Sequence, residues 1–294
     1  MHTLKIDNHS FTLPGAWNEL TGEQFLMVAA LCESRMSLAK FRLTLFTSFT
    51  DLRVLPKKEV YLNRQYYFYL AHGITREFLI ASTELFQICT CFDFMLQPVD
   101  EARTSYKVNY TCIANLLPSF PAPYAILHGP ADGLSNLVYA EYIHAETAYD
   151  AFLRTGKWEH ALRLAAILYR PEVKNLNLNN PEYNGDCREP FNDFFVSGRA
   201  LKLRAVDSKY ITAVLMWYAA CRSWIIKRWP EPFEESGPVE KTDVFTGFMK
   251  MVTSLANNDV TRTEKVRQSY LYDIMFTLQA LAVENKRLNE NTKS

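Results

Sequence analysis

The sequence predicts a mainly α-helical protein: a multi-helix, bundle-like body with a small N-terminal β-hairpin and minor strand content near residues 75–125. Two observations support this fold class. Apolar residues recur at helical spacing through much of the second half, whereas strict alternation is confined to short segments. The clearest helical stripe follows i, i+3, i+4, i+7 spacing and comprises Val214, Trp217, Tyr218, Cys221, Trp224, Ile225 and Arg228.

The first elements are a hairpin and two helices. Residues 3–6 and 11–13 alternate on either side of a polar turn, which is the pattern of a β-hairpin. Thr21 is expected to cap a helix, and a second helix is expected at 38–49. Pro56 is expected to open a third helix through an aromatic run that ends at Gly73.

The middle of the chain is mixed in character. Residues 105–112 alternate apolar and polar side chains, which favours a strand, and residues 80–91 fit either a helix or a strand. Three prolines then break regular structure at Pro118, Pro121 and Pro123. We therefore expect an N-terminal domain at 1–123 and a helical domain at 124–294, which could pack as one unit.

The pattern after this boundary is helical. Asp207 or Ser208 can cap the longest helix, and Pro230 with Pro232 ends it. Arg170 is expected at a helix C-terminus, where the helix dipole favours a cation. Residues 174–191 are rich in Asn, Pro and Gly and are expected to form a loop. Helices are expected at about 136–154, 158–169, 207–229, 241–257 and 261–288.

The composition and charge of the chain argue against several classes of function. The 32 basic and 32 acidic residues cancel, which argues against a general affinity for nucleic acid or for an anionic membrane. The N-terminus lacks a signal-peptide pattern, and the longest apolar run, 211–221, is too short to cross a bilayer, so we expect a cytosolic protein. The six cysteines lie scattered in apolar segments and are expected to be reduced.

No catalytic motif stands out. Glu141 and His144 have the Glu-x-x-His spacing of ferritin-like metal sites, but such a site needs a second motif and further glutamates. Cys89 and Cys91 are too close for a zinc knuckle. We therefore expect no enzyme, no cofactor and no metal, and the enzymatic alternative would be a metal-dependent site centred on Glu141 and His144.

Five residues are candidates for contact with a protein partner. The loop containing Asp186 and Arg188 is either a turn fixed by an arginine–carboxylate pair or a partner-docking loop. The aromatic stripe is typical of a central core helix, with Trp224 and Trp229 emerging at a surface as the alternative. Trp17 completes this set of interaction positions.

The chain also resembles helical proteins encoded by phages and prophages of Bacteroidetes. The order and spacing of five pieces within residues 14–233 carry the resemblance: WNELTGEQF, GPADGLSNLVYAEYIHAE, AAILYRP, YNGDCREPF and WYAACRSWI. The resemblance implies a tail-assembly chaperone or a minor tail protein, with tail proteins as partners, in the host cytoplasm or in the virion. The alternative is a host-side helical adaptor or regulatory scaffold.

Overall fold

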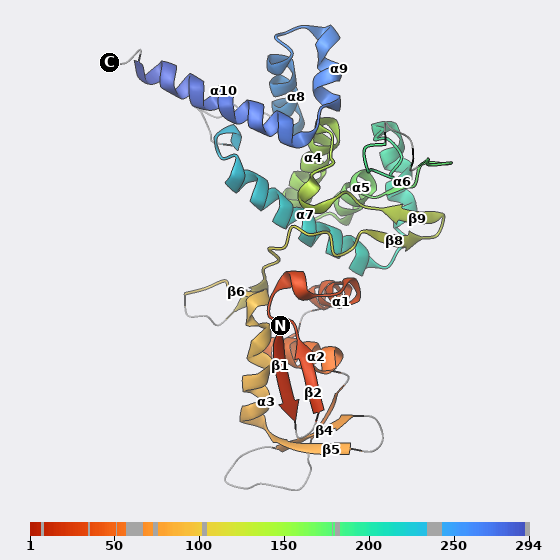
Figure 1. Cartoon of the computed structure of the whole chain (residues 1–294), viewed down its shortest axis with the longest axis vertical. Coiled ribbons are helices and arrows are strands. Elements are labelled where there is room, and N and C mark those ends of the chain that lie inside the picture. The colour runs from red at the N-terminus through yellow and green to blue at the C-terminus, as the bar shows by residue number, and fades with distance from the viewer. Residues whose placement is uncertain are drawn as a thin grey trace. The chain divides into compact units, whose positions relative to one another are not determined.

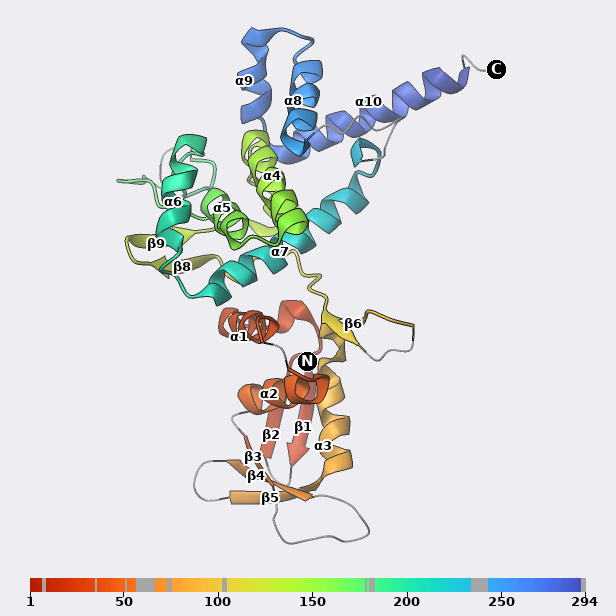
Figure 2. The same cartoon turned by 180° about the vertical axis from the view of Figure 1, so that it is seen from behind.

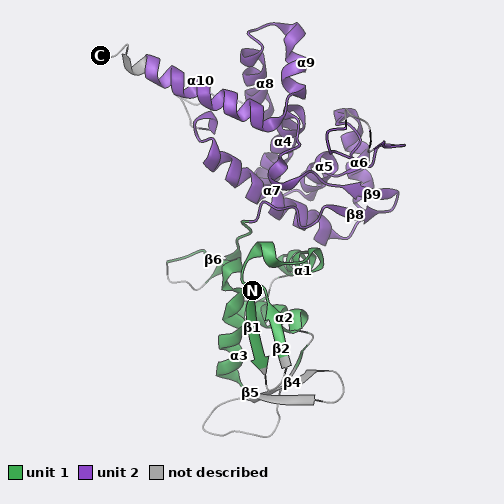
Figure 3. Ribbon diagram, viewed as in Figure 1, with its two compact units in different colours: residues 1–111 green, residues 112–294 purple. Residues whose placement is uncertain are grey.

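The computed structural model describes residues 1–6, 9–34, 36–50, 52–56, 67–72, 76–101, 105–177, 179, 183–233 and 243–291. The chain forms two compact units, Met1–Thr111 and Cys112–Ser294 (Figure 3). The predicted fold class is confirmed, because 61% of the structure is helical and the strands are few and short. Residues 112–123, which the sequence analysis assigns to the first domain, belong by their contacts to the second unit.

Unit 1 begins with the predicted hairpin and two predicted helices. Strands β1 (His2–Ile6) and β2 (His9–Leu13) pair antiparallel. Helix α1 (Gly22–Cys32) is capped by Thr21, whose hydroxyl accepts a hydrogen bond from the Gln24 amide at 3.2 Å. The Gln24 side chain in turn accepts from the Thr21 amide at 3.0 Å, which completes a capping box. Helix α2 spans Leu38–Thr50.

The predicted third helix is wrong where the structure describes it. Its start at Pro56 is the end of strand β3 (Arg53–Pro56), and its aromatic run contributes strand β4 (Tyr67–His72). Together with β5 (Arg76–Ala81) these strands form an antiparallel sheet in the order β3-β4-β5. Tyr and Phe favour strands, and β4 pairs with a strand on each side. The aromatic run therefore forms a strand there rather than a helix. Residues 57–66 and Gly73 lie outside the described residues.

The rest of unit 1 contains the segment for which the sequence left helix and strand open. Helix α3 (Ser82–Cys89) and the 3-10 helix η2 (Thr90–Met95) follow β5 directly, so the 80–91 region is mainly helical. A short antiparallel pair, β6 (Leu96–Pro98) and β7 (Tyr106–Val108), confirms part of the strand predicted at 105–112.

Unit 2 opens with a small sheet that the sequence analysis did not predict. Strands β8 (Ser119–Ala122) and β9 (Ala125–His128) form a hairpin, and β10 (Arg170–Pro171) pairs with the other side of β9. Pro121 is compatible with this sheet because β8 is an edge strand, where a missing amide donor is tolerated.

Some helices of unit 2 lie beside this sheet, and the C-terminal helices of the unit extend away from it (Figures 1 and 2). Four helices of unit 2 confirm predicted helices: α4 (Tyr139–Thr155), α5 (Trp158–Leu168), α7 (Ser208–Arg228) and α8 (Val244–Leu255). Helix α6 (Val196–Leu203), which follows the 3-10 helix η4 (Asp193–Phe195), was not predicted. Asp207 caps α7, and the aromatic stripe makes α7 a core helix, as the spacing predicts.

The predicted final helix, 261–288, is broken in two. Helices α9 (Val260–Gln268) and α10 (Leu271–Asn291) are separated because Ser269 is extended. The Ser269 carbonyl accepts from the Tyr139 amide at 2.9 Å, and the Leu271 amide donates to the Leu137 carbonyl at 2.8 Å. This short bridge to a distant segment satisfies backbone groups that a continuous helix would otherwise pair internally. None of the helices within the described ranges is long and apolar enough to span a bilayer.

Candidate functional site

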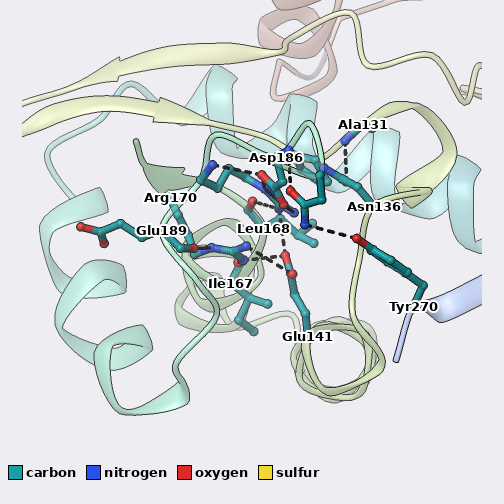
Figure 4. A network of polar contacts seen from close by, with 12 residues as sticks. Ala131, Asn136, Glu141, Ile167, Leu168, Arg170, Asp186, Glu189 and Tyr270 are labelled. Atoms are coloured by element: carbon teal, nitrogen blue, oxygen red, sulfur yellow. Dashed lines mark hydrogen bonds and ion pairs between the residues drawn. The ribbon is translucent and has the colours of Figure 1, made fainter. Parts of the chain in front are cut away.

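A buried ion-pair network lies within unit 2 (Figure 4). The Glu141 carboxylate on α4 accepts hydrogen bonds from Nη1 of Arg170 at 2.6 Å and from Nη1 of Arg188 at 2.9 Å. Asp186 supplies the second carboxylate, whose Oδ2 lies 2.7 Å from Nη2 of Arg188. Two guanidinium groups thus face two carboxylates, so the formal charges balance in a site almost closed to water.

The network shifts the pKa values of two of its members, Asp186 and Arg188. Burial by itself raises the pKa of Asp186, but the hydrogen bonds and positive charge of Arg188 outweigh it and leave the pKa below its usual value. Burial likewise opposes the charge on Arg188, yet Glu141 and Asp186 raise its pKa. These interactions favour the charged forms of Asp186 and Arg188 at neutral pH.

The network anchors an otherwise irregular loop to the helices. Arg188, which is 3% exposed, also donates to the Leu168 carbonyl at the end of α5 at 2.8 Å. Nε of Arg170 donates to the Glu189 carbonyl at 2.7 Å, and the Glu189 amide donates to Pro171 at 2.8 Å. The segment that follows position 188 therefore starts from a fixed position on the body of the unit.

That segment lines a groove of about 970 Å³ beside α6. One wall is a single face of η4 and α6, formed by Phe194, Phe195, Gly198, Arg199 and Lys202. The rest of the lining comes from segments 171–174 and 189–192 and from Tyr124 of the β8–β9 hairpin. We call this feature the α6 groove.

The α6 groove contains two exposed aromatic rings. Phe194 is 83% exposed and Phe195 is 54% exposed, and their rings meet edge to face at 5.5 Å. The side chain of Asn192 accepts a hydrogen bond from the Phe194 amide at 3.0 Å and so fixes the turn that presents them. Large apolar side chains held in water beside a groove are typical of a protein-binding surface.

The groove also contains polar groups that the protein does not fully pair. Arg199 is only 7% exposed, and its Nη1 donates to the Ala166 carbonyl at 2.7 Å. Within the described part of the chain no carboxylate lies within ion-pair distance of Arg199. Burial, and then the nearby charge of Arg170, lower the pKa of Arg199. Lys202 lies 4.7 Å from the ring centre of Tyr124, whose buried hydroxyl has no hydrogen-bond partner among the described residues.

The other predicted interaction residues lie in separate clusters. Trp17 belongs to unit 1, is 4% exposed, and donates from its indole nitrogen to the Asn109 carbonyl at 3.0 Å. Trp224 and Trp229 pack against each other at 5.9 Å near the end of α7, and both contact Tyr272 of α10. Trp229 is buried and Trp224 is partly exposed, so neither ring stands free of the protein.

Glu141 and His144 do not face a common ligand position. The carboxylate of Glu141 is occupied by Arg170 and Arg188, while the His144 ring packs against Phe191 at 5.3 Å and Phe245 at 5.5 Å. No cluster of three or more potential metal-binding His, Cys, Asp or Glu residues occurs in the described parts of the chain.

The sequence analysis missed the α6 groove because it ended its account of this region with the loop. A usable signal was present in the spacing of Val196, Ala200 and Leu203, which α6 buries at i, i+4 and i+7. The exposed pair Phe194–Phe195 directly precedes this short amphipathic stripe.

Comparisons with protein-family models, with curated proteins and with solved structures find no match to this chain.

Proposed function

We propose that this chain is a non-enzymatic, phage- or prophage-encoded protein that binds tail components during virion assembly or as a minor structural part. The observation that carries the binding role is the α6 groove, with Phe194 and Phe195 exposed at its wall. The identity of the partner as a tail component comes from the resemblance to helical phage proteins.

The construction of the groove supports a binding role. Aromatic side chains supply large contact area for little conformational entropy, which is why they are enriched at the centres of protein interfaces. The 189–192 wall is held by the buried network through Arg170 and Glu189 rather than by solvent-exposed contacts. A surface positioned in this way loses less entropy when a partner binds than a mobile loop would lose.

The test is affinity capture from the native host. Tagged protein would be recovered after phage induction, and its partners would be identified by mass spectrometry beside purified virions. We expect tail proteins among the partners. Presence of the chain in virions would identify a minor structural part, and its absence would identify an assembly factor. Recovery of host proteins alone would replace this proposal with the host-side adaptor or regulatory scaffold.

A further inference from the structure

The α6 groove has more cationic than anionic side chains among its described lining residues. Lys174, Arg199 and Lys202 line it, and Glu189 is its only acidic lining residue among those described. A guanidinium as buried as that of Arg199 is stabilised strongly by a carboxylate, yet among the described residues it donates to the neutral carbonyl of Ala166. The groove therefore favours an anionic group from outside the chain.

The positions of the cations on α6 also indicate which kind of ligand the groove would bind. Arg199 and Lys202 are three residues apart on α6, so their side chains leave the same helix face one turn apart. Phe195 lies four residues before Arg199 and Gly198 directly precedes it, so the apolar surface adjoins the cations. A Cβ built on Gly198 meets no atom within 4 Å, which leaves open space between the phenylalanines and the charged end.

Resting on the proposed function, we infer that the α6 groove binds a partner segment in which a carboxylate is next to an aromatic side chain. The carboxylate is received by Arg199 and Lys202, and the aromatic side chain packs on Phe194 and Phe195. A carboxylate can form paired hydrogen bonds with a guanidinium.

A peptide fits the groove better than a nucleic acid. Binding along a phosphate backbone needs a basic surplus or stripe, whereas this chain has 32 basic and 32 acidic residues. The three cations of the groove share it with Glu189 and with a largely apolar wall. This arrangement matches one or two carboxylates flanked by apolar groups.

The probe is a fluorescein-labelled peptide, Gly-Ser-Phe-Asp-Phe-Ser-Gly, compared with the same peptide carrying Asn in place of Asp. Fluorescence anisotropy would be measured with the full chain. A charge-assisted hydrogen bond contributes enough for the Asp peptide to bind about tenfold more tightly or better. Equal affinities for the two peptides, or binding of neither, would overturn the inference.

Substitutions on and next to α6 test which residues cause the preference for the Asp peptide. Lys202→Glu should remove the preference for Asp. Arg204→Glu makes the same charge change at the C-cap of α6, outside the groove lining, and should shift affinity less than about twofold. Gly198→Leu should fill the groove and weaken both peptides, with Gly198→Ala as its matched control. These exposed or open positions avoid the structural bond of Arg199 to Ala166.

The outcomes also separate this inference from the proposed function. If the peptides bind equally but Phe194→Ser/Phe195→Ser still loses tail proteins in the capture experiment, the carboxylate preference is wrong and the proposed function stands. If the Asp preference depends on Lys202 but tail proteins are never captured, the inference stands and the partner assignment is wrong. Displacement of the Asp peptide by a single-stranded oligothymidine would overturn the inference in favour of a nucleic-acid groove.

Discussion

Arg188 shows how burial changes the meaning of a charged loop residue. Its sequence neighbours suggest either a local turn or a docking loop, and the structure places it between Asp186 and Glu141 with its side chain closed to water. Its charge is compensated only while both carboxylates are present. Replacing one partner in such a network leaves the others buried and unpaired, which is more destabilising than loss of an exposed ion pair.

We therefore predict that Arg188→Glu destabilises unit 2 by about 3–5 kcal/mol or prevents its folding. Three carboxylates would then share a site with one guanidinium. Urea unfolding followed by circular dichroism measures the effect. Arg163→Glu, an equal charge change at an exposed position of α5, is the control and should be close to wild type. A normal unfolding curve for Arg188→Glu would contradict the structural role of the network.

His144 gives unit 2 a predicted dependence on pH. Burial against Phe191 and Phe245 lowers the pKa of His144 below the usual 6.5, although Asp193 partly offsets this effect. The unfolded chain therefore binds a proton at a higher pH than the folded chain does. This contribution to stability is fully present above about pH 6.5 and is lost as pH falls through the lower folded pKa.

Replacing this histidine should flatten the pH profile. His144→Gln cannot take up the proton, so its free energy of unfolding should fall less than that of wild type between about pH 7.5 and pH 5. Denaturant titrations at a series of pH values compare the two slopes. Parallel profiles for the two proteins would show that His144 titrates alike in the folded and unfolded chains.

At the scale of elements, the sequence predicts best where a helix is defined by its own stripe. Helix α7 was predicted because Val214, Trp217 and Cys221 repeat on one face, and that face is buried. The aromatic run containing β4 was misread because its state depends on pairing with β3 and β5. The break at Ser269 could not be predicted either, since it depends on hydrogen bonds to a distant segment: Ser269 bonds to Tyr139, and Leu271 bonds to Leu137.

The candidate site likewise contains some contacts that the sequence indicates and others that it does not. The Asp186–Arg188 pair spans two residues and was available from the sequence as one interpretation of the loop. Glu141 lies 47 residues from Arg188, so its place in the network could not be read from spacing. Arg170 was expected to interact with a helix end, and it does donate to the Ile167 carbonyl in the last turn of α5.

Two glycines provide a matched test of the helix boundaries. Gly156 ends α4 with a φ of 65°, and Gly198 lies inside α6, yet a Cβ at either position meets no atom within 4 Å. Gly156→Ala should destabilise by about 1 kcal/mol or more, because only the left-handed backbone penalises it. Gly198→Ala should stabilise by about 0.5–1 kcal/mol, because alanine has the higher helix propensity.

Urea unfolding of both variants measures the difference between them. Effects of the same sign would show that one of these two helix assignments is incorrect. The comparison needs no assumption about packing, since both methyl groups enter open space.

At the scale of the whole molecule, the division into two units predicts which fragments fold. The first residues of unit 2 complete its core: the Ile113 carbonyl accepts from the Trp217 indole at 3.0 Å, and the Leu117 carbonyl accepts from the Tyr169 hydroxyl at 2.8 Å. Phe120 of β8 is also buried. A fragment needs these residues even though they precede the helical region.

We predict that fragment 112–294 folds with a cooperative thermal transition, whereas fragment 124–294 does not. The shorter fragment loses β8 and leaves the buried groups of Trp217 and Tyr169 without their acceptors. Circular dichroism melts of both fragments decide the matter. Equal, cooperative melts would mean that residues 112–123 do not belong to this unit.

We propose that the α6 groove is the surface through which this protein captures a tail component. The most direct measurement is quantitative mass spectrometry of proteins captured after phage induction by wild type, Phe194→Ser/Phe195→Ser and Leu201→Ser. Leu201 is an exposed apolar residue on the same helix outside the groove lining, so it controls for loss of surface hydrophobicity. The account predicts that tail proteins are recovered with wild type and Leu201→Ser and are lost with the double variant. Equal recovery by all three proteins would contradict it.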